Sequence, residues 1–185
     1  MNPLTRLFFL LAPLALMGCS EPRSTTFAGA DVPVDPAEFR QQVVDASGID
    51  LIPVGIEDWE DRMATIDGEV TVIDYWATWC IPCIERFPHM VEMSHNYPQV
   101  RFISVNLDDP GDPEAYIEAL DFLEAVGADF ENYHMTASMF DSFGFFNLRS
   151  IPAVSIFDRA GDEAVRLSGD DPNNQFDESD IENAV

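Results

Sequence analysis

The sequence contains no lysine: all nine of its basic residues are arginines, against 34 aspartates and glutamates. The formal net charge at pH 7 is -25. A surface of this charge repels nucleic acid and anionic lipid headgroups, and it favours neutral or basic partners. Nucleic-acid binding is therefore not expected, and the charge alone identifies no partner.

Cysteine is also scarce, with three residues in the chain: Cys19, Cys80 and Cys83. A structural zinc ion usually takes four ligands, commonly from two Cys-x-x-Cys pairs or from one pair and suitably spaced histidines. The sequence has one such pair, and its three histidines lack a paired spacing. A metal site is therefore the weaker interpretation, and no cofactor is expected.

Long apolar runs are missing as well. The longest, Leu7–Met17, is too short to span a membrane comfortably but has the order of a secretory signal peptide. It ends in Leu-Met-Gly-Cys, which resembles the bacterial lipobox, where the cysteine becomes the lipidated first residue. We expect a signal peptide at 1–18, a lipid-anchored linker at 19–35 and a protein on the periplasmic side of a bacterial membrane. The alternative is a plain signal peptide, with Cys19 present by chance.

Residues 36–185 are enough for one well-buried domain and too few for two. Apolar and β-branched runs predict buried strands at 69–77, 100–107 and 151–158, with a shorter strand at 130–135 and a returning hairpin strand at 163–169. Helical spacing predicts helices at 36–46, 56–66, 80–96, 113–127 and 136–146, and a turn or two of helix at the end of the chain. Strands that alternate with helices predict an α/β domain with a mixed central sheet flanked by helices.

The Cys80–Cys83 pair allows three interpretations: a redox centre, half of a metal site, or a structural disulfide. A bridge that closes so short a loop adds little stability, which counts against a purely structural role. At the start of a helix, unpaired N–H groups and the helix dipole favour the thiolate form of the first cysteine. We therefore predict Cys80 as the nucleophile and Cys83 as the resolving thiol.

The segment "WATWCIPC", followed about seventy residues later by Ile151-Pro152 and a strand, resembles the thioredoxin superfamily over about residues 50–170. The resemblance is closest to the membrane-tethered TlpA/ResA-like thiol-disulfide oxidoreductases. It implies a thioredoxin-like fold in which Cys80 and Cys83 are catalytic and Pro152 belongs to a cis-proline loop beside them. It further implies that Trp79, Pro82 and Ile151 contact the substrate.

Asp74 occupies the position of the buried acid that thioredoxins carry beneath the cysteines. Burial would raise its pKa and suit it to accept the proton of Cys83. The sequence departs from the family twice: Ser104 stands where thioredoxin has a lysine near this acid, and Arg86 stands where ResA-like proteins often have a glutamate. Without that lysine, we expect Asp74 to be still harder to ionise.

The resemblance implies an extracytoplasmic thiol-disulfide oxidoreductase that reduces the disulfides of protein partners. Its expected partners are protein thiols and disulfides, a membrane electron donor, and the membrane through the lipid anchor. A disulfide oxidase or isomerase is the alternative within this chemistry, and a redox-inactive binding module on the same fold is the alternative outside it.

Lipidation of Cys19 is directly testable. We expect the membrane-extracted mature protein to begin at Cys19 and to exceed the mass of residues 19–185 by a lipid modification. Intact-mass spectrometry measures this, and an unmodified Cys19 would contradict the lipobox interpretation.

Overall fold

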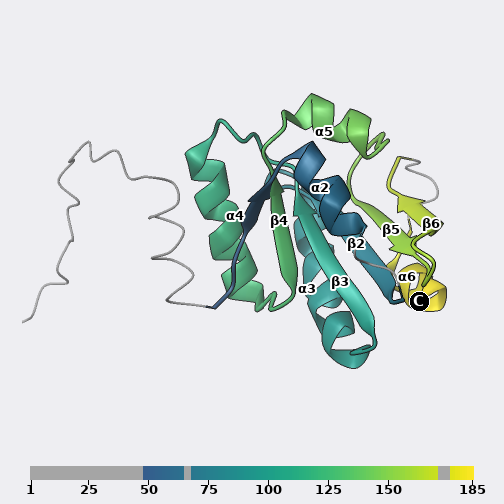
Figure 1. The fold of residues 1–185 in the computed structure, drawn as a ribbon. Helices are drawn as coiled ribbons and strands as arrows, with labels where there is room; N and C mark the ends of the chain where they lie inside the picture. The colour runs from purple at the N-terminus through teal and green to yellow at the C-terminus, as the bar shows by residue number, and fades with distance from the viewer. Residues whose placement is uncertain (1–47, 65–67, 171–175) are drawn as a thin grey trace, which may run out of the picture. The chain divides into compact units, whose positions relative to one another are not determined.

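The computed structural model describes residues 48–64, 68–170 and 176–185 (Figure 1). The predicted signal peptide, the linker and the helix expected at 36–46 lie outside these ranges. Within them, no helix is both long enough and apolar enough to cross a bilayer.

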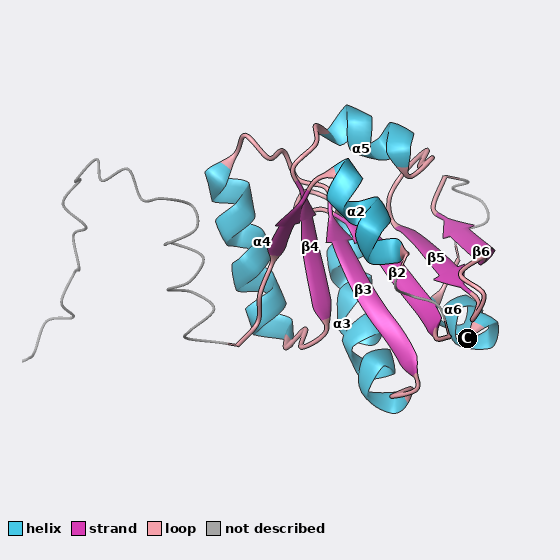
Figure 2. Ribbon diagram, viewed as in Figure 1, coloured by secondary structure: helices cyan, strands magenta, loops and turns pink. Residues whose placement is uncertain are grey.

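A six-stranded mixed sheet forms the centre of the domain (Figure 2). Its strands lie in the order β1-β4-β3-β2-β5-β6. The first four in this order run parallel, whereas β5 is antiparallel to both of its neighbours. The strands are β1 (Ile52–Val54), β2 (Val70–Trp76), β3 (Val100–Asn106), β4 (Glu131–Met135), β5 (Ala153–Phe157) and β6 (Glu163–Ser168). The predicted mixed α/β sheet is confirmed.

Five helices are described: α2 (Ile56–Met63), α3 (Ile81–Asn96), α4 (Pro113–Val126), α5 (Met139–Phe145) and α6 (Glu178–Ala184). Each corresponds to a helix that the sequence predicts. β1 is the one described strand that the sequence analysis did not predict. It has three residues and contains Pro53, which a central strand excludes but an edge strand such as β1 tolerates.

The helices cover both faces of the sheet, with α2 in front and α3 behind in the view of Figure 1. On the α3 face, Phe87 and Leu120 join α3 and α4 in one apolar cluster, while Met90 and Ile181 join α3 and α6 in another. On the opposite face, Trp59 of α2 packs in edge-to-face contact with Phe146, directly after α5. Burial on both faces explains why β2 and β3 read as nearly continuous apolar runs.

The two-residue period of β2 determines the direction in which Asp74 points. Val72 and Trp76 belong to the clusters on the α3 face, whereas Ile73 and Tyr75 belong to the cluster on the opposite face. Because alternate side chains of a strand share a face, Asp74 points towards α3. The sheet thus places a carboxylate beneath the helix that begins after Cys80.

Gly127 ends α4 in the left-handed conformation, with φ 72° and no atom within 4 Å of the position that an added Cβ would take. An alanine there meets backbone strain, so Gly127→Ala should lower the free energy of unfolding by about 1 kcal/mol. The exposed Gly144 lies inside α5 with equal space and an ordinary helical backbone. Gly144→Ala should therefore leave stability unchanged or raise it by up to about 1 kcal/mol. Urea unfolding of the full chain measures both variants, and the same sign for both would contradict the assignment.

Candidate redox site

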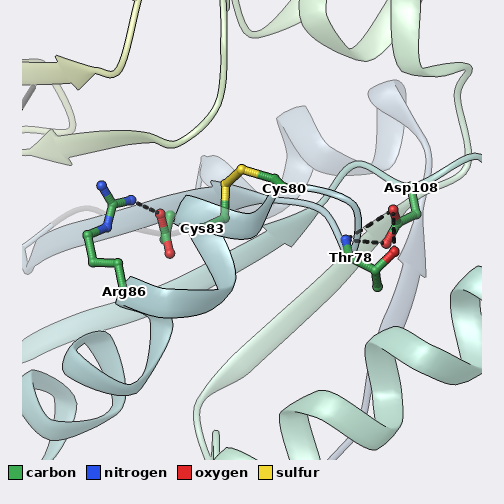
Figure 3. Close-up of a disulfide and its surroundings, with 6 residues drawn as sticks. Thr78, Cys80, Cys83, Arg86 and Asp108 are labelled. Atoms are coloured by element: carbon green, nitrogen blue, oxygen red, sulfur yellow. Dashed lines mark hydrogen bonds and ion pairs between the residues drawn. A yellow bond between two sulfur atoms is a disulfide. The ribbon is translucent and has the colours of Figure 1, made fainter. Parts of the chain in front are cut away.

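Cys80 and Cys83 form a disulfide at the start of α3 (Figure 3). Cys80 is the N-cap residue, and its carbonyl oxygen accepts hydrogen bonds from the backbone N–H groups of Cys83 and Ile84. Cys80 retains 4% exposure, whereas Cys83 has none. The two sulfurs are therefore unequal, and Cys80 is the one that a partner can reach first.

The first turn of α3 is electrostatically suited to a thiolate. It contains no acidic residue, and Pro82 lies in it, where the missing N–H costs no helical hydrogen bond. The positive end of the dipole of this 16-residue helix stabilises negative charge near Cys80. This arrangement is the one that the sequence predicts for an attacking cysteine.

Asp74 forms a buried ion pair with Arg86, one turn after Cys83 on α3. Nη2 of Arg86 donates to Oδ1 of Asp74 over 3.0 Å, and the two side chains are 8% and 1% exposed. In Figure 3 the Arg86 guanidinium reaches its partner on the side of α3 where Cys83 lies. The ion pair thus connects β2 to the helix that carries both cysteines.

Burial raises the pKa of Asp74 from its usual 3.8 to about 6, although the charge and hydrogen bond of Arg86 lower it. The burial of Asp74 and the upward direction of its pKa are as the sequence predicts. Ser104, which replaces the family lysine, lies beside Asp74 in the β2–β3 register, but Asp74 does not lack a cation because Arg86 supplies one from α3. Arg86 was noted only as a departure from the family pattern, and its contact with Asp74 was missed.

A second polar contact holds the loop before Cys80. Asp108, which is 1% exposed, accepts hydrogen bonds from the backbone N–H and the hydroxyl of Thr78, at 3.1 and 3.0 Å (Figure 3). It also accepts from Nδ2 of Asn106 at 2.7 Å. Asp108 is not among the site residues predicted from the sequence. The available signal was its position directly after a buried strand, at the sheet edge where the carboxyl ends of parallel strands gather.

The network continues from Asn106 to His134. Nδ1 of His134 lies 2.7 Å from Oδ1 of Asn106, an oxygen that only accepts, so this ring nitrogen carries the proton. Burial lowers the pKa of His134, opposed by the charge of Asp108. His134 is only 4% exposed. It is a buried support of the Asp108 network.

The other predicted site residues are placed as follows. The Ile151–Pro152 peptide bond is cis, and Ile151 packs against the apolar cluster that contains both cysteines. Pro82 is exposed, and Trp79 is 55% exposed beside the disulfide. Trp76, at the end of β2, is fully buried in the core.

Comparison with known proteins agrees with this geometry. The thioredoxin family model matches residues 50–118. The matched residues include Cys80 and Cys83, so the likeness to thioredoxin covers the candidate redox site. It is 40% identical over 55 residues to thioredoxin H4-2 of Oryza sativa subsp. japonica, a match that covers 29% of this chain and 42% of the rice protein. It is 24% identical over 129 residues to the thiol-disulfide oxidoreductase ResA of Geobacillus kaustophilus, covering 68% of this chain and 70% of ResA.

Among solved structures, a protein from Chlorobium tepidum described as a candidate thiol:disulfide interchange protein DsbE has a TM-score of 0.52 and 26% identity. That match covers 65% of this chain and 80% of the other. The chain spans less than half of the rice thioredoxin, whereas it spans about two thirds or more of the ResA and DsbE-like chains. The matches to ResA and to the DsbE-like protein therefore cover more of this chain than the match to the rice thioredoxin does.

Replacement of Asp108 should lower the stability of the domain, because Asp108 holds the loop that contains Thr78. Asp108→Ala leaves the donors of Thr78 and Asn106 without their acceptor, so the free energy of unfolding should fall by about 2 kcal/mol or more. Asp109→Ala is the matched control, because Asp109 is exposed and accepts one local hydrogen bond from Gly111. It should change stability by no more than about 0.5 kcal/mol. Urea unfolding of the oxidised variants measures both, and equal losses would contradict the assigned role of Asp108.

Proposed function

We propose that this protein is an extracytoplasmic thiol-disulfide oxidoreductase that reduces disulfide bonds of protein partners. The observation that carries the proposal is the placement of a barely exposed Cys80 and a fully buried Cys83 at the N-terminus of α3. One sulfur can meet a partner, and the other can react only with the first. A reversible redox pair needs one accessible and one protected sulfur, whereas a structural disulfide does not.

The chemistry proceeds in two exchanges. The Cys80 thiolate attacks one sulfur of a partner disulfide, and the other partner sulfur leaves as a thiolate. Cys83 then loses its proton and attacks Sγ of Cys80, which re-forms the Cys80–Cys83 disulfide and releases the second partner thiol. Two electrons pass from the protein to its partner. A membrane electron donor would return them for the next cycle.

The surroundings of Cys80 support contact with an extended partner chain. Trp79 is exposed on one side, and the cis-proline loop with Ile151 packs against the cysteine cluster. We assign substrate contact to Trp79, Pro82, Ile151 and Pro152. The reducing direction is supported by the likeness to thioredoxins and ResA and by an isoleucine before the cis-proline, as the family resemblance implies for thioredoxin.

Location and anchoring are part of the same proposal. The lipobox-like end of the apolar run supports a domain outside the cytoplasm, tethered through Cys19 and the linker 19–35, with residues 36–185 as the thioredoxin-like domain. In such a compartment the Cys80–Cys83 disulfide forms readily, so the donor is needed to keep the pair reduced.

Replacement of the resolving cysteine tests the exchange. Cys83→Ser, reduced and mixed with insulin as a disulfide substrate, should accumulate a covalent mixed disulfide through Cys80. The wild-type chain should resolve the same species and release reduced insulin. Non-reducing electrophoresis followed by peptide mass mapping identifies the linked residue.

Cys80→Ser is the matched control. It retains Cys83 with no exposure, so it should trap no insulin. Failure of Cys83→Ser to trap insulin would contradict the proposal and favour a redox-inactive binding module.

A further inference from the structure

Arg86 is a buried arginine. Its side chain is 8% exposed and meets a carboxylate that is 1% exposed. A charge removed from water in this way costs several kcal/mol unless a partner compensates it. The two charges therefore depend on each other, and neither is a solvated surface group.

Only one oxygen of Asp74 is used in this contact. Oδ1 accepts from Arg86, whereas Oδ2 is buried and has no hydrogen-bond partner among the described residues. An unsatisfied carboxylate oxygen is costly in a protein interior, and a proton donor would relieve that cost. The geometry leaves Oδ2 as the oxygen free to accept a proton.

A proton donor is available on the buried side of α3, in the thiol that Cys83 carries when the pair is reduced. Residues three apart on a helix lie on the same face, about 5–6 Å apart at their Cβ atoms. Arg86 and Cys83 are related in this way, and both are buried residues of α3. Asp74, held by Arg86, therefore lies against the face of α3 that carries Cys83.

Arg86 is itself fixed from the other side. Its guanidinium carbon lies 4.2 Å from the ring centroid of Phe176, just before α6. A cation over an aromatic face is stabilised by the ring quadrupole, more so when it is desolvated. The guanidinium is thus held between β2 and the C-terminal segment.

We propose that Arg86 is a positioning residue for the resolving step, which binds one oxygen of Asp74 and leaves the other to take the proton of Cys83. This inference rests on the proposed thiol-disulfide exchange. In the mixed disulfide, the S–H proton of Cys83 passes to Oδ2 of Asp74. The Cys83 thiolate forms a bond to Sγ of Cys80, the bond from Cys80 to the partner breaks, and the partner thiolate leaves with that electron pair. Asp74 then returns the proton to the leaving thiolate or to solvent.

The groups packed around Asp74 identify what else could titrate. α3 presents Cys83 and Arg86, while the neighbouring strands place Ser104 and Val154 in register with Asp74. The next turn of α3 carries His89, whose Nε2 lies 3.4 Å from Glu182 of α6. The phenol of Tyr75 points to the opposite face, and burial raises its pKa to about 12. In the oxidised protein, Asp74 is thus the acid beside Arg86 that titrates near neutrality.

Two measurements on the full chain test the proposal. The first is the titration of the Asp74 carboxyl carbon by nuclear magnetic resonance in the oxidised protein, where Cys83 has no proton to lose. The wild-type midpoint should lie at about pH 6, and Arg86→Gln should move it upwards, because the lost cation favoured the carboxylate. Arg86→Lys should restore most of the shift.

The second measurement is the reaction of the reduced protein with an aromatic disulfide that releases a coloured thiolate at each step. The first release reports attack by Cys80, and the second, independent of reagent concentration, reports attack by Cys83. At pH 7, Arg86→Gln should slow the second phase about two- to tenfold and leave the first nearly unchanged. The difference should shrink at higher pH, where Asp74 ionises without help, and Arg86→Lys should recover the rate.

Arg101→Gln is the matched control, because Arg101 makes a bidentate pair with Glu131 away from the cysteines, at 2.7 and 2.9 Å. It should move neither the Asp74 midpoint nor the second phase. An unchanged midpoint in Arg86→Gln would overturn the inference, as would a shifted midpoint with an unchanged second phase. Wild-type protein that releases no coloured thiolate would instead overturn the proposed function, and the inference with it.

Discussion

The buried contact between Asp74 and Arg86 is the interaction on which the site depends. It joins the central strand β2 to the helix that carries both cysteines, and it does so one turn below Cys83. A buried pair of this kind adds little net stability compared with apolar residues of the same volume, but loss of one partner is costly. In the proposed mechanism, its value is that it places the Asp74 carboxylate on the side of α3 where Cys83 lies.

A second polar contact restrains the other side of the disulfide. Asp108 binds Thr78, which precedes Cys80 in the chain, and Asp74 binds Arg86, which follows Cys83. The Cys80–Cys83 disulfide therefore lies between two buried carboxylates (Figure 3). The two are different in kind. Asp108 has four hydrogen bonds from two residues and supports the loop, whereas Asp74 has one and keeps its other oxygen unbonded. A carboxylate whose two oxygens both accept hydrogen bonds is suited to a structural role. A carboxylate with one unbonded oxygen is suited to exchange a proton.

Apolar packing makes these contacts possible. Both cysteines belong to a cluster with Trp76, Phe87 and residues of α4, so the first turn of α3 rests on an apolar core. In that environment the charge of Asp74 is opposed by desolvation and favoured by Arg86, and the balance leaves its pKa at about 6. The same carboxylate on an exposed strand end would be ionised at every physiological pH and would have little affinity for a thiol proton.

Much of the fold could be predicted from the sequence, because strands buried on both faces and amphipathic helices have distinct residue patterns. β1 was missed because three residues with a central proline carry no strand pattern, and its partner β4 lies about 80 positions further along the chain. The cysteines and Asp74 were found through local sequence. The contacts of Arg86 with Asp74 and of Asp108 with Thr78 were not found, because they join residues 12 and 30 positions apart that meet only once α3 and the strand ends are placed.

Determination of the reduction potential of the Cys80/Cys83 pair, by equilibration of the full chain with glutathione or dithiothreitol, tests the central claim most directly. The account predicts reversible exchange with a potential close to the roughly -270 mV of thioredoxin. A potential near about -120 mV, that of the oxidant DsbA, would contradict the reducing role, and a disulfide that does not exchange at all would contradict the redox function itself.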